Sequence, residues 1–123
     1  ISRVMLAVKT VLADEEDTPT LIFDEIDTGI SGITAGKVGD RLRLIGKSRQ
    51  VICITHLPQI AATADHHFLI RKKAEGTSVR TDVEMLDEAA SVEELARLLG
   101  GANVTERVME SAKELKELAK CER

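Results

Sequence analysis

The sequence is poor in aromatic residues and has no excess of basic ones. It contains two phenylalanines, Phe23 and Phe68, and neither tryptophan nor tyrosine. Proteins that bind single-stranded nucleic acid commonly stack bases on aromatic side chains, so this composition argues against such a platform. The 17 lysine and arginine residues stand against 21 aspartate and glutamate residues, giving a net charge of −4. The chain is therefore not a broadly basic nucleic-acid binder, and the short basic run at 71–73 is typical of a solvated strand end.

Long apolar runs, secretory signals and cysteine patterns are also missing. No segment approaches the roughly 18 consecutive apolar residues of a membrane span, and no signal peptide opens the chain. Cys53 lies in an apolar run and Cys121 in a charged tail, without the spacings of disulfide frameworks or metal sites. A reducing, cytoplasmic setting fits this pattern. The sequence begins with "ISRVMLAV", already inside a helical pattern and without an initial methionine, so we expect a piece of a longer chain.

The first half of the sequence alternates between helical and strand-like patterns. At 123 residues and 43% hydrophobic composition, it is one globular domain or part of one. A helix is predicted to begin at Ser2, followed by a buried strand at 20–23. A second helix, capped by Thr34, is predicted to reach Gly46. A second apolar strand at 50–55 and a short helix from Pro58 complete the series. This order predicts an α/β fold in which parallel strands are joined by crossover helices.

The second half has a different organisation. Segments 66–74 and 78–86, separated by a turn at 75–77, predict an antiparallel hairpin with a polar outer face. A capping box at 91–94 predicts a helix that begins at Ser91 and ends before Gly100. A last helix is predicted over 105–120, with one apolar stripe that packs on the domain rather than forming a coiled coil.

Acidic residues and a histidine follow the two apolar strands. The stretch "LIFDEIDTGISG" places Asp24 and Glu25 at the end of one strand, and "VICITH" places His56 at the end of the next. In parallel α/β sheets, ligands gather beyond the carboxyl ends of the strands. Carboxylate oxygens suit Mg²⁺, bound directly or through water. Glu25 could then activate water for attack on a phosphoryl group, and His56 could hydrogen-bond the transferring phosphate.

Each of these residues also has a structural interpretation. Acids at a strand end can simply cap the following element, and Asp27 could cap the turn as readily as take part in chemistry. His66 and His67 alternate across a strand, so they point to opposite faces and do not ligate one metal together. The acidic run at 14–17 is typical of a solvated loop.

Two other classes of function compete with nucleotide hydrolysis. In the first, Asp24, Glu25 and Asp27 bind two cations in a metal-dependent nuclease, although no further acids follow the later strands. In the second, the chain is a non-catalytic interaction module and the acid pair is structural. The sequence also has no G-x-x-x-x-G-K-[ST] loop to cradle phosphates, and Lys37 and Lys47 lie outside any such pattern. If this is a nucleotide site, half of it lies elsewhere.

Four segments together resemble a known family. "SRVMLAVKTVLAD", "TLIFDEIDTGISG", "VICITHLPQIAATAD" and "SVEELARLLGG" are similar to the C-terminal part of the RecN family of bacterial DNA repair proteins. That family is related to the SMC proteins within the ABC-type ATPases. The resemblance covers nearly the whole chain and implies that residues 1–123 are the C-terminal lobe of a P-loop NTPase-like ATPase head. It implies that the phosphate-binding loop lies on the N-terminal half of the same head, beyond a long coiled coil.

The resemblance assigns roles to individual residues. It implies that Asp24 is the Walker B aspartate that organises Mg²⁺ through water, that Glu25 is the catalytic base and that His56 is the switch histidine. Ser2-Arg3 would be the end of the signature motif that grips ATP. The resemblance also implies that Ser31 is a nucleotide-binding residue. It stands where many ABC-type ATPases carry an aspartate that crosses the dimer interface, and "DTGISG" is the RecN-like form of this loop.

The resemblance also implies cofactors, partners and a cellular role. ATP and Mg²⁺ would be the ligands, and a second head would join in an ATP-dependent dimer. The full-length protein would act on DNA in double-strand break repair and recombination, in the bacterial cytoplasm and with the nucleoid, without a membrane. The isolated chain would be inactive as an ATPase.

Overall fold

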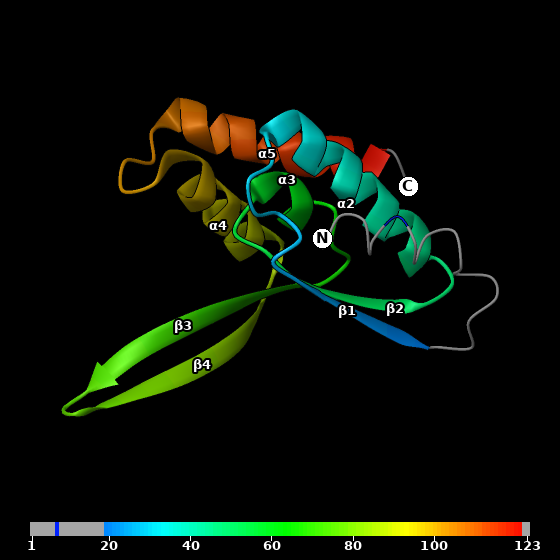
Figure 1. The fold of residues 1–123 in the computed structure, drawn as a ribbon. Helices are drawn as coiled ribbons and strands as arrows, with labels where there is room; N and C mark the ends of the chain where they lie inside the picture. The colour runs from blue at the N-terminus through cyan, green and yellow to red at the C-terminus, as the bar shows by residue number, and fades with distance from the viewer. Residues whose placement is uncertain (1–6, 8–18, 122–123) are drawn as a thin grey trace. The chain divides into compact units, whose positions relative to one another are not determined.

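The computed structural model describes residue 7 and residues 19–121, which form two compact units that divide between Thr63 and Ala64 (Figure 1). Each unit is considered by itself. The helix predicted from Ser2, including the Ser2-Arg3 pair, and the acidic run at 14–17 lie outside the described residues.

The first unit is built on two parallel strands. Strand β1 spans Thr20–Asp24 and strand β2 spans Gln50–Ile54, with Thr20 opposite Gln50 and Asp24 opposite Ile54. Helix α2, Gly32–Gly46, connects them, and the short helix α3, Pro58–Ala61, follows β2. The predicted order of elements is confirmed here. Both strands end at the same edge of the sheet, because parallel strands run in one direction.

One face of this sheet is covered and the other is exposed. Leu21 and Phe23 point into the core, whereas Ile22 between them is 67% exposed. Alternation of this kind follows from the two-residue period of a strand. The core of the unit consists of apolar residues from β1, the loop after it, α2 and α3: Leu21, Phe23, Ile26, Ala35, Val38, Leu42, Ile45 and Ile60.

The cap of helix α2 lies three residues earlier in the sequence than expected. The predicted cap, Thr34, is inside the helix, and Ser31 is the capping residue, whose hydroxyl accepts a hydrogen bond from the backbone N–H of Thr34 at 3.4 Å. Both residues are good capping types, so the local pattern did not separate them. Farther along, Gly39 allows α2 to lie close to α3, since a Cβ there would come within 2.9 Å of the Thr63 methyl group.

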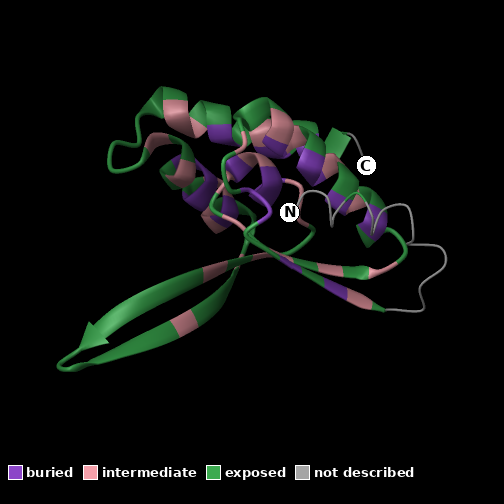
Figure 2. Cartoon of the chain, in the orientation of Figure 1, coloured by how far each residue is buried: buried purple, intermediate pink, exposed green. Residues whose placement is uncertain are grey.

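The second unit is a hairpin followed by two helices. Strands β3, His67–Glu75, and β4, Ser78–Leu86, pair in antiparallel fashion around a turn at Gly76. Helices α4, Glu88–Gly100, and α5, Glu106–Cys121, pack against each other through Leu95, Ala96, Ala112 and Ala119, all of which are buried (Figure 2). The predicted hairpin and the packing stripe of the last helix are confirmed. None of the helices in the described part of the chain combines the length and apolar character that crossing a membrane requires.

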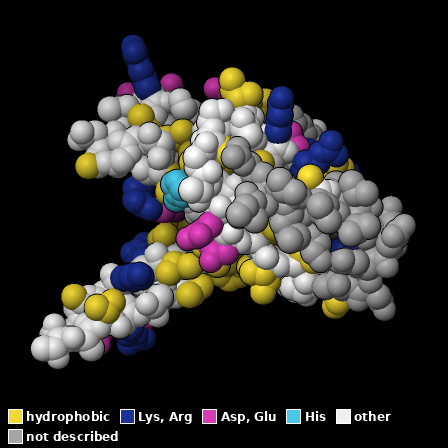
Figure 3. All heavy atoms as spheres, in the orientation of Figure 1, with side chains coloured by type: hydrophobic (Ala, Val, Ile, Leu, Met, Phe, Trp, Pro, Cys, Tyr) yellow, Lys and Arg dark blue, Asp and Glu magenta, His cyan; other side chains and the backbone are white. Residues whose placement is uncertain are grey.

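The prediction of a polar outer face on the hairpin is wrong. Phe68 pairs with Met85 and Ile70 pairs with Val83, so these four side chains share one face of the two-stranded sheet. All four are more than half exposed, and hydrophobic side chains are visible along the hairpin in Figure 3. An uncovered apolar face of this kind is typical of a surface on which another part of a protein packs.

The predicted start of helix α4 is also wrong. Asp87 caps the helix by accepting a hydrogen bond from the Ala90 N–H at 2.8 Å, and Ser91 lies one turn inside. Ser91 is 2% exposed, and its hydroxyl oxygen lies 2.7 Å from Nδ1 of His67 and accepts a hydrogen bond from the buried Lys116 Nζ at 2.9 Å. This polar cluster joins β3, α4 and α5, which explains why a hydroxyl is needed at that position.

We expect the stability of the second unit to fall on acidification. Burial lowers the pKa of His67 below its ordinary value of 6.5, and the charge of Lys116 lowers it further, whereas Glu94 opposes the shift. As the pH falls below about 6.5, the unfolded state therefore binds a proton that the folded state resists, and the free energy of unfolding decreases. Hydrogen exchange of α4 amides in the full-length protein, corrected for intrinsic rates, should show weaker protection at about pH 5.5 than at about pH 7.5.

The neighbouring histidine provides the control for this expectation. His67→Gln should flatten the pH dependence, whereas His66→Gln, at an exposed position, should leave it unchanged. An equally steep decrease in His67→Gln would show that another group is responsible.

Candidate functional site

The predicted acidic residues lie where β1 ends. Asp24 is the last residue of the strand, and Glu25 follows it; both side chains are exposed. Glu25 has a φ of +58°, a left-handed conformation that a residue with a side chain adopts at a cost of about 1 kcal/mol. Strained backbone of this kind is concentrated at functional sites, where the surrounding structure maintains it. The Thr28 hydroxyl donates to the Glu25 carbonyl oxygen at 3.2 Å and helps to hold this turn.

His56 follows β2 at the same edge of the sheet. Its side chain is 73% exposed, and its ring nitrogen Nδ1 lies 3.1 Å from Oδ2 of Asp27. The pairing of β1 with β2 therefore brings the acidic loop and the histidine together, as the sequence predicted.

Asp27 turns inward, which the sequence did not establish. Its carboxylate is 4% exposed, and Oδ2 accepts hydrogen bonds from the Thr55 hydroxyl at 2.5 Å and the His56 backbone N–H at 3.1 Å. Burial raises the pKa of Asp27, but the hydrogen bonds from Thr55 and His56 outweigh it and lower that pKa overall. Asp27 is therefore ionised at neutral pH, and its buried oxygen is occupied by protein donors.

This geometry counts against the nuclease interpretation. That interpretation requires Asp24, Glu25 and Asp27 to face shared cations, whereas the Asp27 oxygen is turned toward protein donors. Within residues 19–121, no group of three or more histidine, cysteine, aspartate or glutamate side chains is placed to hold a metal ion.

Cys53 lies half-buried beneath the site, and burial, together with the charges of Asp27 and Asp24, raises the pKa of its thiol to about 11. It therefore stays protonated at neutral pH, a state that does not favour nucleophilic attack.

The donor set suits Mg²⁺ held through water. The side chains of Asp24 and Glu25 make no hydrogen bond or ion pair with the described part of the chain, so their oxygens are available to solvent and ligands. Mg²⁺ commonly retains several waters and takes one or two protein carboxylates together with substrate phosphates. Asp24 fits that role, and the remaining ligands would come from the phosphates and from residues elsewhere.

Ser31 and the Ser2-Arg3 pair are the other predicted contacts of the nucleotide. Ser31 is exposed and serves as the N-cap of α2, as described above. Ser2 and Arg3 lie outside the described residues, so their predicted contact with ATP stays a prediction.

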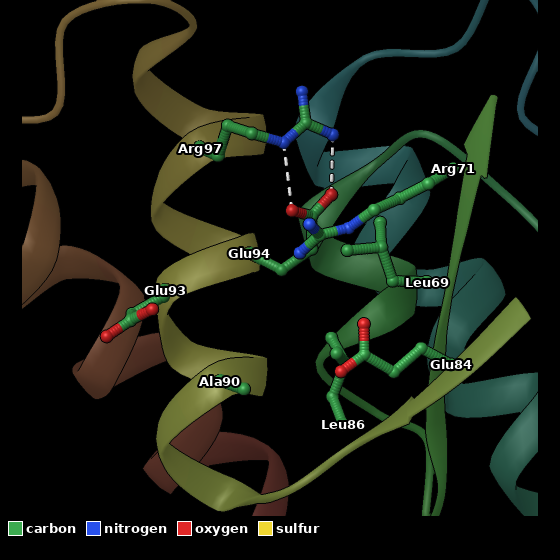
Figure 4. Close-up of a pocket in the computed structure, with 8 residues that line it drawn as sticks. All are labelled: Leu69, Arg71, Glu84, Leu86, Ala90, Glu93, Glu94 and Arg97. Atoms are coloured by element: carbon green, nitrogen blue, oxygen red, sulfur yellow. Dashed lines mark hydrogen bonds and ion pairs between the residues drawn. The ribbon is translucent and has the colours of Figure 1, made fainter. Parts of the chain in front are cut away.

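A hollow in the second unit does not fit a nucleotide. It lies between the hairpin and α4, has a volume of about 290 Å³ and contains no predicted site residue (Figure 4). Arg97 in its wall forms two hydrogen bonds with Glu94, at 2.8 and 2.5 Å. Three glutamates and two arginines line it, so the balance of charge opposes a polyphosphate: Glu84, Glu93, Glu94, Arg71 and Arg97.

Curated proteins similar in sequence to this chain are DNA repair proteins named RecN. No model of a known protein family matches the chain. Over 115 residues, 94% of this chain, it is 47% identical to the DNA repair protein RecN of Vibrio cholerae. Over 119 residues, 97% of this chain, it is 47% identical to RecN of Halalkalibacterium halodurans. The RecN protein of Bacillus subtilis is 41% identical over 115 residues. The chain spans about a fifth of the length of these relatives, at their C-terminal segment.

A solved structure supports the same fold. It comes from work on ATP-driven dimerization and DNA-stimulated activation of SMC ATPases and matches with a TM-score of 0.62 at 20% identity. The match covers 83% of this chain and 61% of that one. The predicted α/β fold is confirmed, and this chain shares it with that structure.

Proposed function

We propose that this chain, which matches the C-terminal segment of the RecN proteins along nearly its whole length, is the C-terminal lobe of their ATPase head. In the full-length protein, it would supply the acids and the histidine for ATP hydrolysis during the repair of DNA double-strand breaks. The lobe covers residues 1–123, and the phosphate-binding loop lies on the N-terminal half of the head.

One observation carries this proposal: two parallel strands end side by side, one in Asp24 and Glu25 and the other in His56. Ligands of parallel sheets bind beyond such ends. The ring contact between His56 and Asp27 holds the histidine at the loop that carries the acids. The open carboxylates of Asp24 and Glu25 then face the region where a Mg-nucleotide would bind.

Each residue has a distinct role in the proposed reaction. When bound, Mg²⁺ neutralises charge on the phosphates and positions them for attack. Asp24 would help to hold the metal through water, and Glu25 would accept a proton from the attacking water. His56 hydrogen-bonds the terminal phosphate. Ser31 and the Ser2-Arg3 pair are proposed contacts of the nucleotide held between two heads, and loss of the terminal phosphate would loosen that dimer.

The uncovered sheet faces support a partner lobe. In the first unit, Ile22, Ile52 and Ile54 are each at least 44% exposed on the face opposite the core. In the second unit, the hairpin presents its own apolar face. Surfaces of this kind are covered in stable proteins. We propose that the N-terminal half of the head covers them, while DNA contacts belong to the full-length protein.

We expect Asp24→Asn in the full-length protein to raise the Mg²⁺ concentration for half-maximal ATPase activity about tenfold or more. The amide keeps the size of the side chain but removes the charge that holds the waters of the cation. Activity is measured in a Mg²⁺ titration at saturating ATP. Asp40→Asn, which alters an aspartate paired with Arg43 on α2, is the control. An unchanged Mg²⁺ requirement in Asp24→Asn would contradict the proposed role.

A further inference from the structure

Asp27 has a side-chain environment unlike that of the acids beside it. Asp24 and Glu25 are exposed, whereas Asp27 is buried. Its carboxylate contacts Thr55 and His56, the two residues that follow β2. A buried ionised carboxylate is costly unless donors surround it. The Thr55 hydroxyl and the His56 backbone N–H both donate to Oδ2, and Nδ1 of the His56 ring lies 3.1 Å from the same oxygen. These contacts of the Asp27 carboxylate therefore lie on the segment that carries the histidine.

We propose that Asp27 is a positioning residue that fixes the ring of His56 for its contact with the terminal phosphate. This inference rests on the proposed function. Nδ1 of the ring lies 3.1 Å from Oδ2 of Asp27, close enough for the charge of the carboxylate to act on that nitrogen. The negative charge favours a hydrogen on the nearer nitrogen, Nδ1, which leaves Nε2 for the nucleotide. Asp27 thus selects which nitrogen faces the phosphate, as the partner of a functional histidine commonly does.

The backbone contacts extend the same control to the position of the residue. The His56 N–H donates to the oxygen that the ring also contacts, so main chain and side chain are fixed together. Thr55 donates to that oxygen as well, and its hydroxyl in turn accepts from the Leu57 N–H at 3.0 Å. The segment that carries His56 is therefore tied on both sides to the loop that carries Glu25. Misplacement of a reacting group by about 1 Å can reduce a rate about 100-fold.

Asp27→Asn in the full-length protein tests the inference. The asparagine oxygen can still accept from Thr55 and the His56 N–H. The charge that faces the ring is lost, however, and the amide nitrogen can take the place of the oxygen next to the ring. We expect kcat for ATP hydrolysis to fall about 10- to 100-fold, with KM within about twofold. Asp40→Asn should leave both values unchanged.

A double-mutant cycle separates positioning from a merely structural effect. If Asp27 acts through His56, Asp27→Asn should change kcat by less than about twofold in a His56→Ala background. An equal decrease in both backgrounds would overturn the inference, because the loss would then be general. Activity of Asp27→Asn within about twofold of the parent would overturn it as well.

Failure of the inference can be told from failure of the proposed function. If Glu25→Gln and His56→Ala both abolish turnover while Asp27→Asn does not, the proposed function stands and only the positioning role is wrong. If His56→Ala leaves turnover unchanged, the role of the histidine and the inference fail together.

Discussion

Replacing Glu25 with glutamine in the full-length protein is expected to lower ATP turnover by about 100-fold or more, the scale of lost general-base catalysis. Glutamine keeps the length of the side chain and offers an amide where a carboxylate would take the proton of water. The backbone at this position is left-handed, with a φ of +58°, and both side chains meet the same steric cost there. The decrease should therefore report chemistry rather than misfolding.

Binding of nucleotide should survive the same substitution. Since Glu25 acts on water in the proposed reaction, Glu25→Gln should retain ATP and accumulate dimers of engaged heads, which gel filtration with Mg-ATP would detect. Glu110→Gln, at an exposed position on α5, is a matched control that should hydrolyse ATP at the parental rate. Turnover of Glu25→Gln within twofold of the parent would instead favour a non-catalytic module.

Much of the first unit could be predicted because its strands are short apolar runs that end in polar residues. The runs that end at Asp24 and His56 marked two strands, and the helix between them required parallel pairing. The prediction that the strands are buried is wrong, because each is covered on one face only. Parallel pairing then placed both ends at one edge. The conformation of Glu25 and the inward turn of Asp27 could not be predicted. The inward turn of Asp27 depends on contacts with Thr55 and His56, almost 30 residues away in the sequence.

The errors in the second unit have a related cause. Ser91 carries a sound capping pattern, but a buried His67 and a buried Lys116 need its hydroxyl inside the unit, and Asp87 caps the helix instead. In the hairpin, alternation identifies which side chains share a face. It does not identify which face is covered, because apolar residues occur on both, with Phe68 on one and Leu69 on the other.

The second prediction with a large expected effect concerns the ATPase activity of this chain when it is isolated. Because no phosphate-binding loop occurs in its sequence, we expect negligible ATPase activity from the chain alone. Co-expression with an N-terminal half that carries the loop should restore activity, since in the proposed function the two halves together would provide the phosphate cradle, the metal-binding acid and the base. The exposed apolar faces of both units should make the halves copurify.

The most direct test of the account is therefore the ATPase activity of the copurified halves. We expect Mg²⁺-dependent hydrolysis well above that of either half, and its loss by about 100-fold or more when this chain carries Glu25→Gln. Glu110→Gln in the same chain should leave the restored activity intact. Halves that do not associate, or a complex that hydrolyses ATP equally well with Glu25→Gln, would contradict the assignment of the catalytic base to this lobe.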